Sequence, residues 1–86
     1  MERYLVIENE KSRKGLVDTK TKKLILPFEY VVIIVNEEIG YVYGERWREN
    51  NCQTYEVVYK LLEDGKVVSK KFREFFEEFA TYQRNS

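Results

Sequence analysis

The chain has no histidine, one cysteine, one proline and four glycines in 86 residues. Without histidine, Ser-His-Asp and Cys-His nucleophilic sites are excluded, together with the commonest general base at neutral pH. A structural zinc site lacks ligands because Cys52 is the one thiol. The glycines follow no phosphate-binding spacing. We therefore expect a protein that is not an enzyme and that holds no metal or cofactor.

Long apolar segments are also missing. The longest apolar run, Val31 to Val35, is far shorter than the roughly 20 residues of a membrane-spanning helix. The first residues, Met-Glu-Arg-Tyr, lack the apolar segment of a secretion signal. Cys52 has no second cysteine with which to form an internal disulfide, which fits a reducing compartment and a free structural thiol. These features predict a cytoplasmic protein that makes no membrane contact.

Net charge is the third absence. The chain carries 15 basic and 15 acidic residues, so its formal net charge is zero. A neutral molecule does not attract nucleic acid as a whole, and any such contact depends on a local basic patch. The adjacent acids Glu37-Glu38, Glu63-Asp64 and Glu77-Glu78 are sequence neighbours at turns or on a helix, where solvated surface charge is the expected role.

What remains is a series of short apolar and aromatic runs separated by polar turns. Such runs predict β-strands. Pro27 lacks an amide hydrogen and is expected to separate two strands, while Gly15 suggests a bulge or a close backbone approach. Glu45–Gln53 has no periodicity and is expected to be an exposed loop. The predicted strands are Tyr4–Ile7, Gly15–Val17, Leu24–Leu26, Glu29–Val35, Ile39–Tyr43, Thr54–Leu62 and Lys66–Ser69.

The last segment changes period. Phe72, Phe75, Phe76 and Phe79 recur at the spacing of one helix face, with charged residues on the other side. The pattern predicts an amphipathic helix over about residues 70–83, with Ser69 as a possible N-cap. A helix this short needs tertiary packing, so we expect it to dock on the sheet.

The sequence thus predicts an α+β fold in a single domain, residues 1–86. Its strands lie within residues 3–69 and form a small antiparallel sheet, curved or barrel-like, of five to seven hairpin-connected strands. One C-terminal amphipathic helix covers an open face or end of that sheet.

Two groups of residues are candidates for binding a partner. The first is a basic hairpin, for which a solvated edge that prevents sheet association is the alternative interpretation. The second is a loop in which Trp and Arg, residue types common at interface hot spots, are adjacent; the alternative is a Trp that covers a core edge with arginines stacked on it. The first group comprises Lys11, Arg13, Lys14, Lys20, Lys22 and Lys23, and the second Arg46, Trp47 and Arg48.

Residues 14–33, with the sequence K-G-L-V-D-T-K-T-K-K-L-I-L-P-F-E-Y-V-V-I, resemble a WG repeat, also called the KWG repeat. Lys14 stands where that repeat has Trp, Thr21 replaces its turn glycine, and Val31 replaces the Asp after Tyr. Asp64 to Val68 form a faint second copy. The resemblance implies a β-hairpin unit with a binding or scaffolding role and no catalysis. The matching positions are Gly15, Leu16, Val17, Asp18, Lys22, Leu24, Ile25, Pro27 and Tyr30.

The leading functional hypothesis is a non-catalytic protein-binding module, monomeric or homodimeric, that acts by stoichiometric contact. By analogy of size and absent catalytic residues, it resembles small phage-encoded inhibitors of host nucleic-acid-handling complexes such as CRISPR effectors. One alternative is direct nucleic-acid binding through the basic hairpin, residues 11–23. A second is a structural protein that self-assembles through its sheet edges.

Overall fold

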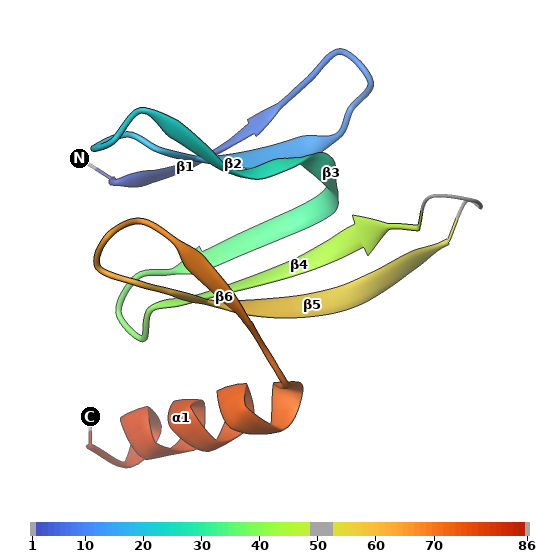
Figure 1. Ribbon diagram of the computed structural model, residues 1–86. Coiled ribbons are helices and arrows are strands. Elements are labelled where there is room, and N and C mark those ends of the chain that lie inside the picture. Colours follow the sequence, from blue (N-terminus) through green and yellow to red (C-terminus); the bar gives the residue numbers. More distant parts are fainter. Residues whose placement is uncertain (1, 49–52, 86) are drawn as a thin grey trace.

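The computed structural model describes residues 2–48 and 53–85, and within these ranges the chain forms six strands and one helix (Figure 1). All the strand pairs are antiparallel, and each strand pairs with its neighbours in the chain, in the order β1-β2-β3-β4-β5-β6. The predicted α+β class is therefore confirmed. The elements are β1 Tyr4–Glu8, β2 Lys14–Asp18, β3 Lys23–Asn36, β4 Tyr41–Trp47, β5 Thr54–Leu61, β6 Val67–Lys70 and α1 Phe72–Asn85.

Strand β3 joins the two halves of the sheet. Its first part pairs with β2 and its last part with β4. We predicted two strands separated by Pro27, but the structure has one strand of 14 residues that continues through the proline. The register shifts between Lys14 and Leu16, so Pro27 lies where the ladder is already interrupted and its missing amide hydrogen costs no pairing.

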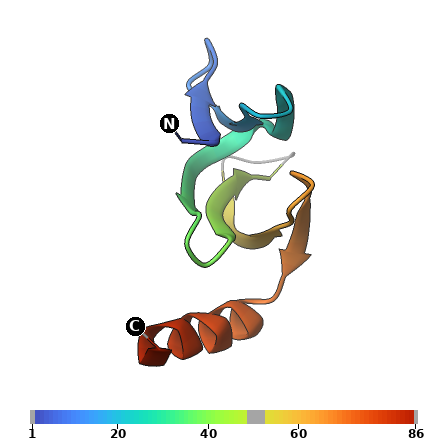
Figure 2. The ribbon, with the colours of Figure 1, turned by 90° about the vertical axis from the view of Figure 1, so that its left-hand side faces the viewer.

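Gly15 lies opposite this irregular stretch of β3. A Cβ atom at Gly15 would lie 2.9 Å from the carbonyl oxygen of Leu26 and 3.3 Å from the Phe28 ring. The close backbone approach, one of the two alternatives predicted at Gly15, is thus confirmed, and the register of the ladder also shifts here. Bulges bend a strand and increase its twist, and the sheet as a whole is strongly curved (Figure 2).

The core occupies the inner, concave face of the curved sheet. The Tyr30 and Tyr59 hydroxyls meet inside it at 2.7 Å, with the two rings edge to face. This bond joins β3 to β5, which are not neighbours in the sheet, and so ties the two halves together. The buried cluster comprises Tyr4, Leu16, Leu26, Tyr30, Ile33, Val42 and Tyr59.

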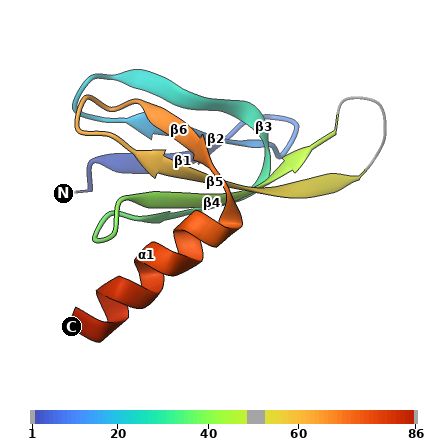
Figure 3. The same ribbon diagram turned by 60° about the horizontal axis from the view of Figure 1, so that its bottom comes forward.

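Helix α1 lies outside this core, across the outer face of β4 and β5 (Figures 1 and 3). Only Lys71 lies between α1 and β6, and Ser69 belongs to β6. The prediction that Ser69 caps the helix was therefore wrong. The Phe75 ring packs against Tyr41 at 5.2 Å between centroids. The helix therefore docks on the sheet, as expected, but Phe76 remains 60% exposed. No helix within the described residues has the length and apolar character needed to cross a membrane.

Candidate functional site

The structure divides the predicted basic hairpin between the two ends of β2. Lys11 and Arg13 lie at the β1–β2 turn, and Lys14 begins β2. Lys20 and Lys22 lie in the β2–β3 turn. Five residues of extended chain separate these turns by roughly 14 Å or more, so the basic residues form two groups.

The third lysine of the second group, Lys23, begins β3 beside Asp18, its register partner. The Asp18 carboxylate is bound by Arg3 and not by these lysine side chains.

The first group joins the second candidate, Arg46, Trp47 and Arg48. The Arg13 guanidinium lies 5.9 Å from the centre of the Trp47 ring. Lys14 pairs in register with Tyr30, and Tyr30 pairs with Arg46. Folding therefore brings together, at one end of the sheet, basic residues from β2 and β4 that are far apart in the sequence.

The predicted loop over Glu45–Gln53 is shorter than expected. Glu45 to Trp47 belong to β4, Trp47 pairs with Thr54, and the Arg48 amide donates to the Gln53 carbonyl at 3.0 Å. Pairing with β5 thus extends β4 into a segment whose sequence shows no strand periodicity. Cys52, predicted to be a free structural thiol, lies outside the described residues.

We call the resulting surface the cationic end. Its arginines lie over aromatic rings: Arg46 is 5.5 Å from the centre of the Tyr30 ring and Arg48 is 4.8 Å from that of Tyr55. A guanidinium stacked in this way is held in place while its N–H edges stay available to acceptors. The cationic end comprises Lys11, Arg13, Lys14, Arg46, Trp47 and Arg48.

Arg46 differs from the other cations of this surface. Burial opposes its charge, but its bond to the Glu29 carboxylate and the nearby Tyr30 raise the pKa of Arg46 above its usual value. Arg13 and Arg48 are exposed and form no ion pair within the described residues. Arg46 is thus part of the structure, whereas Arg13 and Arg48 can bind an anion from outside.

Asp18 lies at the opposite end of β2 and is fully buried. Arg3 donates to both of its oxygens, at 3.0 and 2.9 Å, and the Lys20 amide donates to one of them at 3.0 Å. The bond from Arg3 holds the pKa of Asp18 well below its usual range, although burial acts in the opposite direction. The sequence indicated Asp18 as one of the positions that match the WG repeat, and nothing local pointed to Arg3 as its partner.

The β5–β6 turn closes over this ion pair. Arg3 also lies 3.4 Å from the Glu63 carbonyl oxygen. Gly65 has a φ of +86°, and a Cβ atom there would lie 2.5 Å from an Asp18 oxygen. Asp18 is therefore enclosed and serves the fold, because no room remains for a ligand beside its carboxylate.

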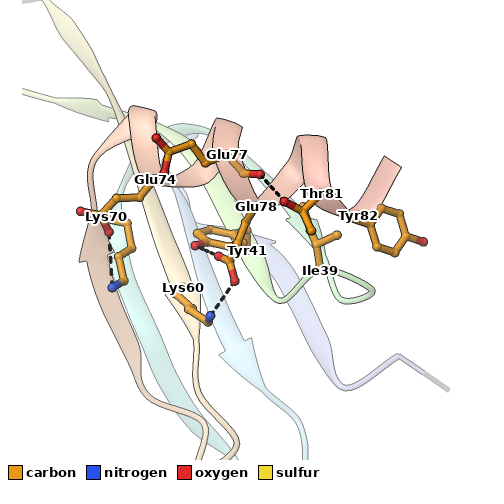
Figure 4. A pocket seen from close by; sticks show the side chains of 9 residues that line it. All are labelled: Ile39, Tyr41, Lys60, Lys70, Glu74, Glu77, Glu78, Thr81 and Tyr82. Carbon is orange, nitrogen blue, oxygen red and sulfur yellow. Dashed lines mark hydrogen bonds and ion pairs between the residues drawn. The ribbon is translucent and has the colours of Figure 1, made fainter. Parts of the chain in front are cut away.

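A groove of about 620 Å³ lies between α1 and the outer face of the sheet (Figure 4). Its charges are paired with one another: Lys60 with Glu78 at 3.0 Å and Lys70 with Glu74 at 3.4 Å. Tyr41 donates to Glu78, and burial followed by that bond raises the pKa of Tyr41 to about 12. These bonds fasten the helix to the sheet and pair both lysines of the groove with acids of α1.

The acidic residues do not assemble into a metal site within the described parts of the chain. Glu77 pairs with Arg73 along the helix, and Glu38 accepts from Tyr82. The adjacent acids of the sequence therefore serve separate surface contacts. Of the surfaces described, the cationic end is the one in which arginines, Arg13 and Arg48, are stacked on rings and form no ion pair within the described residues.

Comparisons of the chain with models of protein families, with curated proteins and with solved structures gave no match.

Proposed function

We propose that this domain is a non-catalytic protein-binding module and that the cationic end contacts an acidic surface of its partner. The observation that carries the proposal is the stacking of Arg13 and Arg48 on aromatic rings, with no acid of the described chain paired to either. Ordered arginines lose little conformational entropy on binding and present the paired N–H groups that carboxylates accept.

The composition of this surface supports a protein partner. Trp and Arg are among the residue types most enriched at interface hot spots, and both occur here. Single-stranded nucleic acid would need exposed rings on which bases stack, but Tyr30 is fully buried and Trp47 and Tyr55 are half-buried beneath arginines. Zero net charge also gives no general attraction to phosphate.

A binding role agrees with what the resemblance of residues 14–33 to a WG repeat implies. A stoichiometric inhibitor of a larger complex, of the phage-encoded type expected from the size of the chain, is one form that such binding takes. In that case the domain acts by occupying an acidic site on its target.

The proposal is tested by affinity capture from the native host with three forms of the chain. The first is the wild type, the second has Arg13→Glu and Arg48→Glu, and the third has Lys20→Glu and Lys22→Glu at the other end of β2. We expect a protein retained by the first and third forms and lost with the second. Calorimetry with that protein purified should give one binding site per chain, weakened by added salt.

A short single-stranded DNA and a duplex of the same sequence are titrated in parallel. Saturable binding of either at low salt, with no captured protein that depends on Arg13 and Arg48, would replace the proposal by the nucleic-acid alternative.

A further inference from the structure

Helix α1 contributes no side chain to the buried core. Of residues 72–84, whose side chains the structure describes, none is buried, and Phe75, the ring that packs on Tyr41, is itself half-buried. The core cluster and the apolar side chains that pack against it all come from the six strands. The sheet therefore completes its core without α1.

The polar bonds that hold α1 on the sheet lie near solvent. In the two ion pairs, Lys60 with Glu78 and Lys70 with Glu74, the side chains are between 33% and 47% exposed. Water and salt screen such pairs, so each contributes little to docking. A further bond joins the end of the helix to the β3–β4 turn, again at the surface. The helix is thus held by weak polar bonds and by half-buried phenylalanines.

Two buried side chains lie under α1, on the outer face of the sheet. Tyr41 is 3% exposed and Val58 is 1% exposed, and neither belongs to the core cluster. Val58 is on the outer face because side chains alternate along a strand and the next residue, Tyr59, lies in the core. In the register of the sheet, Val58 pairs with Tyr43, which pairs with Ile34, a residue 58% exposed. The helix therefore covers one end of an apolar strip whose other end is in solvent.

We infer that α1 is a reversible cover: it detaches from the outer face of β4 and β5 while the six-stranded sheet stays folded, and it thereby exposes Tyr41 and Val58. The occupant of these side chains in the closed state is α1 itself. Figure 2 shows the helix as a separate layer that follows the end of β6, so it stays tethered beside the strip after it detaches.

Detachment also unfolds the helix. A helix of 14 residues is marginal in water once its tertiary contacts are lost. Opening is therefore a local unfolding step, and local steps of this kind need less free energy than unfolding of the whole chain. The closed and open states differ both in helix content and in the exposure of the apolar strip.

Hydrogen exchange of the full-length wild type at neutral pH, followed by NMR for each amide, tests the cover. After correction for intrinsic rates, the amides of residues 76–82 in α1 should exchange at least about 100-fold faster than the slowest amides of β3 and β4. If the α1 amides exchange as slowly as those strand amides, helix and sheet unfold together and the inference is wrong.

Phe75→Asp and Phe76→Asp form a matched pair, because they place the same charge at adjacent positions of one helix. Phe75 packs on Tyr41, whereas Phe76 is 60% exposed. With Phe75→Asp the α1 amides should lose nearly all their protection and the circular dichroism at 222 nm should weaken, while the slowest amides of β3 and β4 keep at least about 100-fold protection. With Phe76→Asp the α1 amides should stay within about fivefold of the wild-type rates.

The dye ANS, which binds exposed apolar surface, reports the uncovered strip. Its fluorescence should rise about threefold or more with Phe75→Asp and stay near the wild-type level with Phe76→Asp. Three results would overturn the inference: strand amides that lose their protection in Phe75→Asp, no added dye binding by that variant, or equal opening of α1 in Phe76→Asp.

The cover and the proposed function fail separately. The variant with Arg13→Glu and Arg48→Glu should lose its partner and keep the wild-type exchange rates in α1. These arginines lie at the end of β4 that carries Trp47, whereas Tyr41, on which the helix packs, begins that strand.

Discussion

The two ends of strand β2 carry the same kind of residue and use it differently. At one end Arg3 is joined to the buried carboxylate of Asp18, beneath the β5–β6 turn. At the other, Arg13 and Arg48 rest on rings and remain exposed. The difference shows that an arginine serves stability when its acid is buried with it, and recognition when an aromatic ring orders it without neutralising it.

Asp18→Asn should have the largest effect on stability, because it removes the ion pair at one of the two ends of β2. The substitution removes a buried charge and leaves Arg3 without its counter-ion, in a place enclosed by the β5–β6 turn. We expect the melting temperature to fall by about 10 °C or more. Asp64→Asn, a change of the same kind on an exposed turn, is the control and should have little effect. Equal effects of the two would show that Asp18 is not a stabilising partner of Arg3.

The same ion pair makes stability depend on pH. The pKa of Asp18 is lower in the folded chain than in the unfolded one, so its contribution is fully present above the unfolded pKa of about 4. It is lost as the pH falls below that value. Urea unfolding should therefore show that the free energy of unfolding of the wild type falls between neutral and acid pH. The fall should be smaller for Asp18→Asn. Parallel curves would contradict this assignment.

Tyr59→Phe changes the core and leaves both ends of β2 unaltered, so its effect on stability can be compared with the effects at the two ends. It leaves the buried Tyr30 hydroxyl without the partner that lies 2.7 Å away, and it should lower the free energy of unfolding by about 1–2 kcal/mol. The double variant with Tyr30→Phe should recover part of that loss, because no unpaired hydroxyl remains. If the double variant loses more free energy of unfolding than the two single variants lose together, the result would argue against this bond.

The smallest effect on stability is expected at the cationic end. Arg13→Glu together with Arg48→Glu should leave the melting temperature within about 2 °C of the wild type, since both residues are exposed. Partner binding should nevertheless be lost. A large drop in melting temperature would instead show that the stacked arginines serve the fold, as the alternative interpretation of Arg46, Trp47 and Arg48 holds.

The sequence predicted the strands well wherever one face alternates. In β5, which was predicted as a strand over Thr54–Leu62, Tyr59 lies in the core and the alternate residues Val57 and Leu61 pack against it. The interruption expected at Pro27 was wrong, because a proline ends a strand only where the ladder needs its amide. Here the register shift opposite Gly15 had already removed that need.

The direction of the helix face could not be predicted. The phenylalanine spacing indicates a helix with an apolar side, but it does not say what that side meets. The outer face of the sheet offers Tyr41 and Lys60, so Glu78, which binds both, turns inward beside Phe75, which packs on Tyr41. The contact between Arg13 and Trp47 was equally hidden, because it depends on how far the sheet curls.

The neighbour-to-neighbour order of the strands has a consequence for folding. Each hairpin can form from adjacent chain, so most of the sheet can be built without closing long loops. The contact of Arg3 with Glu63 joins residues near the start of the chain to the β5–β6 turn, and we expect it to form last. Weakening that contact should therefore speed unfolding while leaving the folding rate almost unchanged.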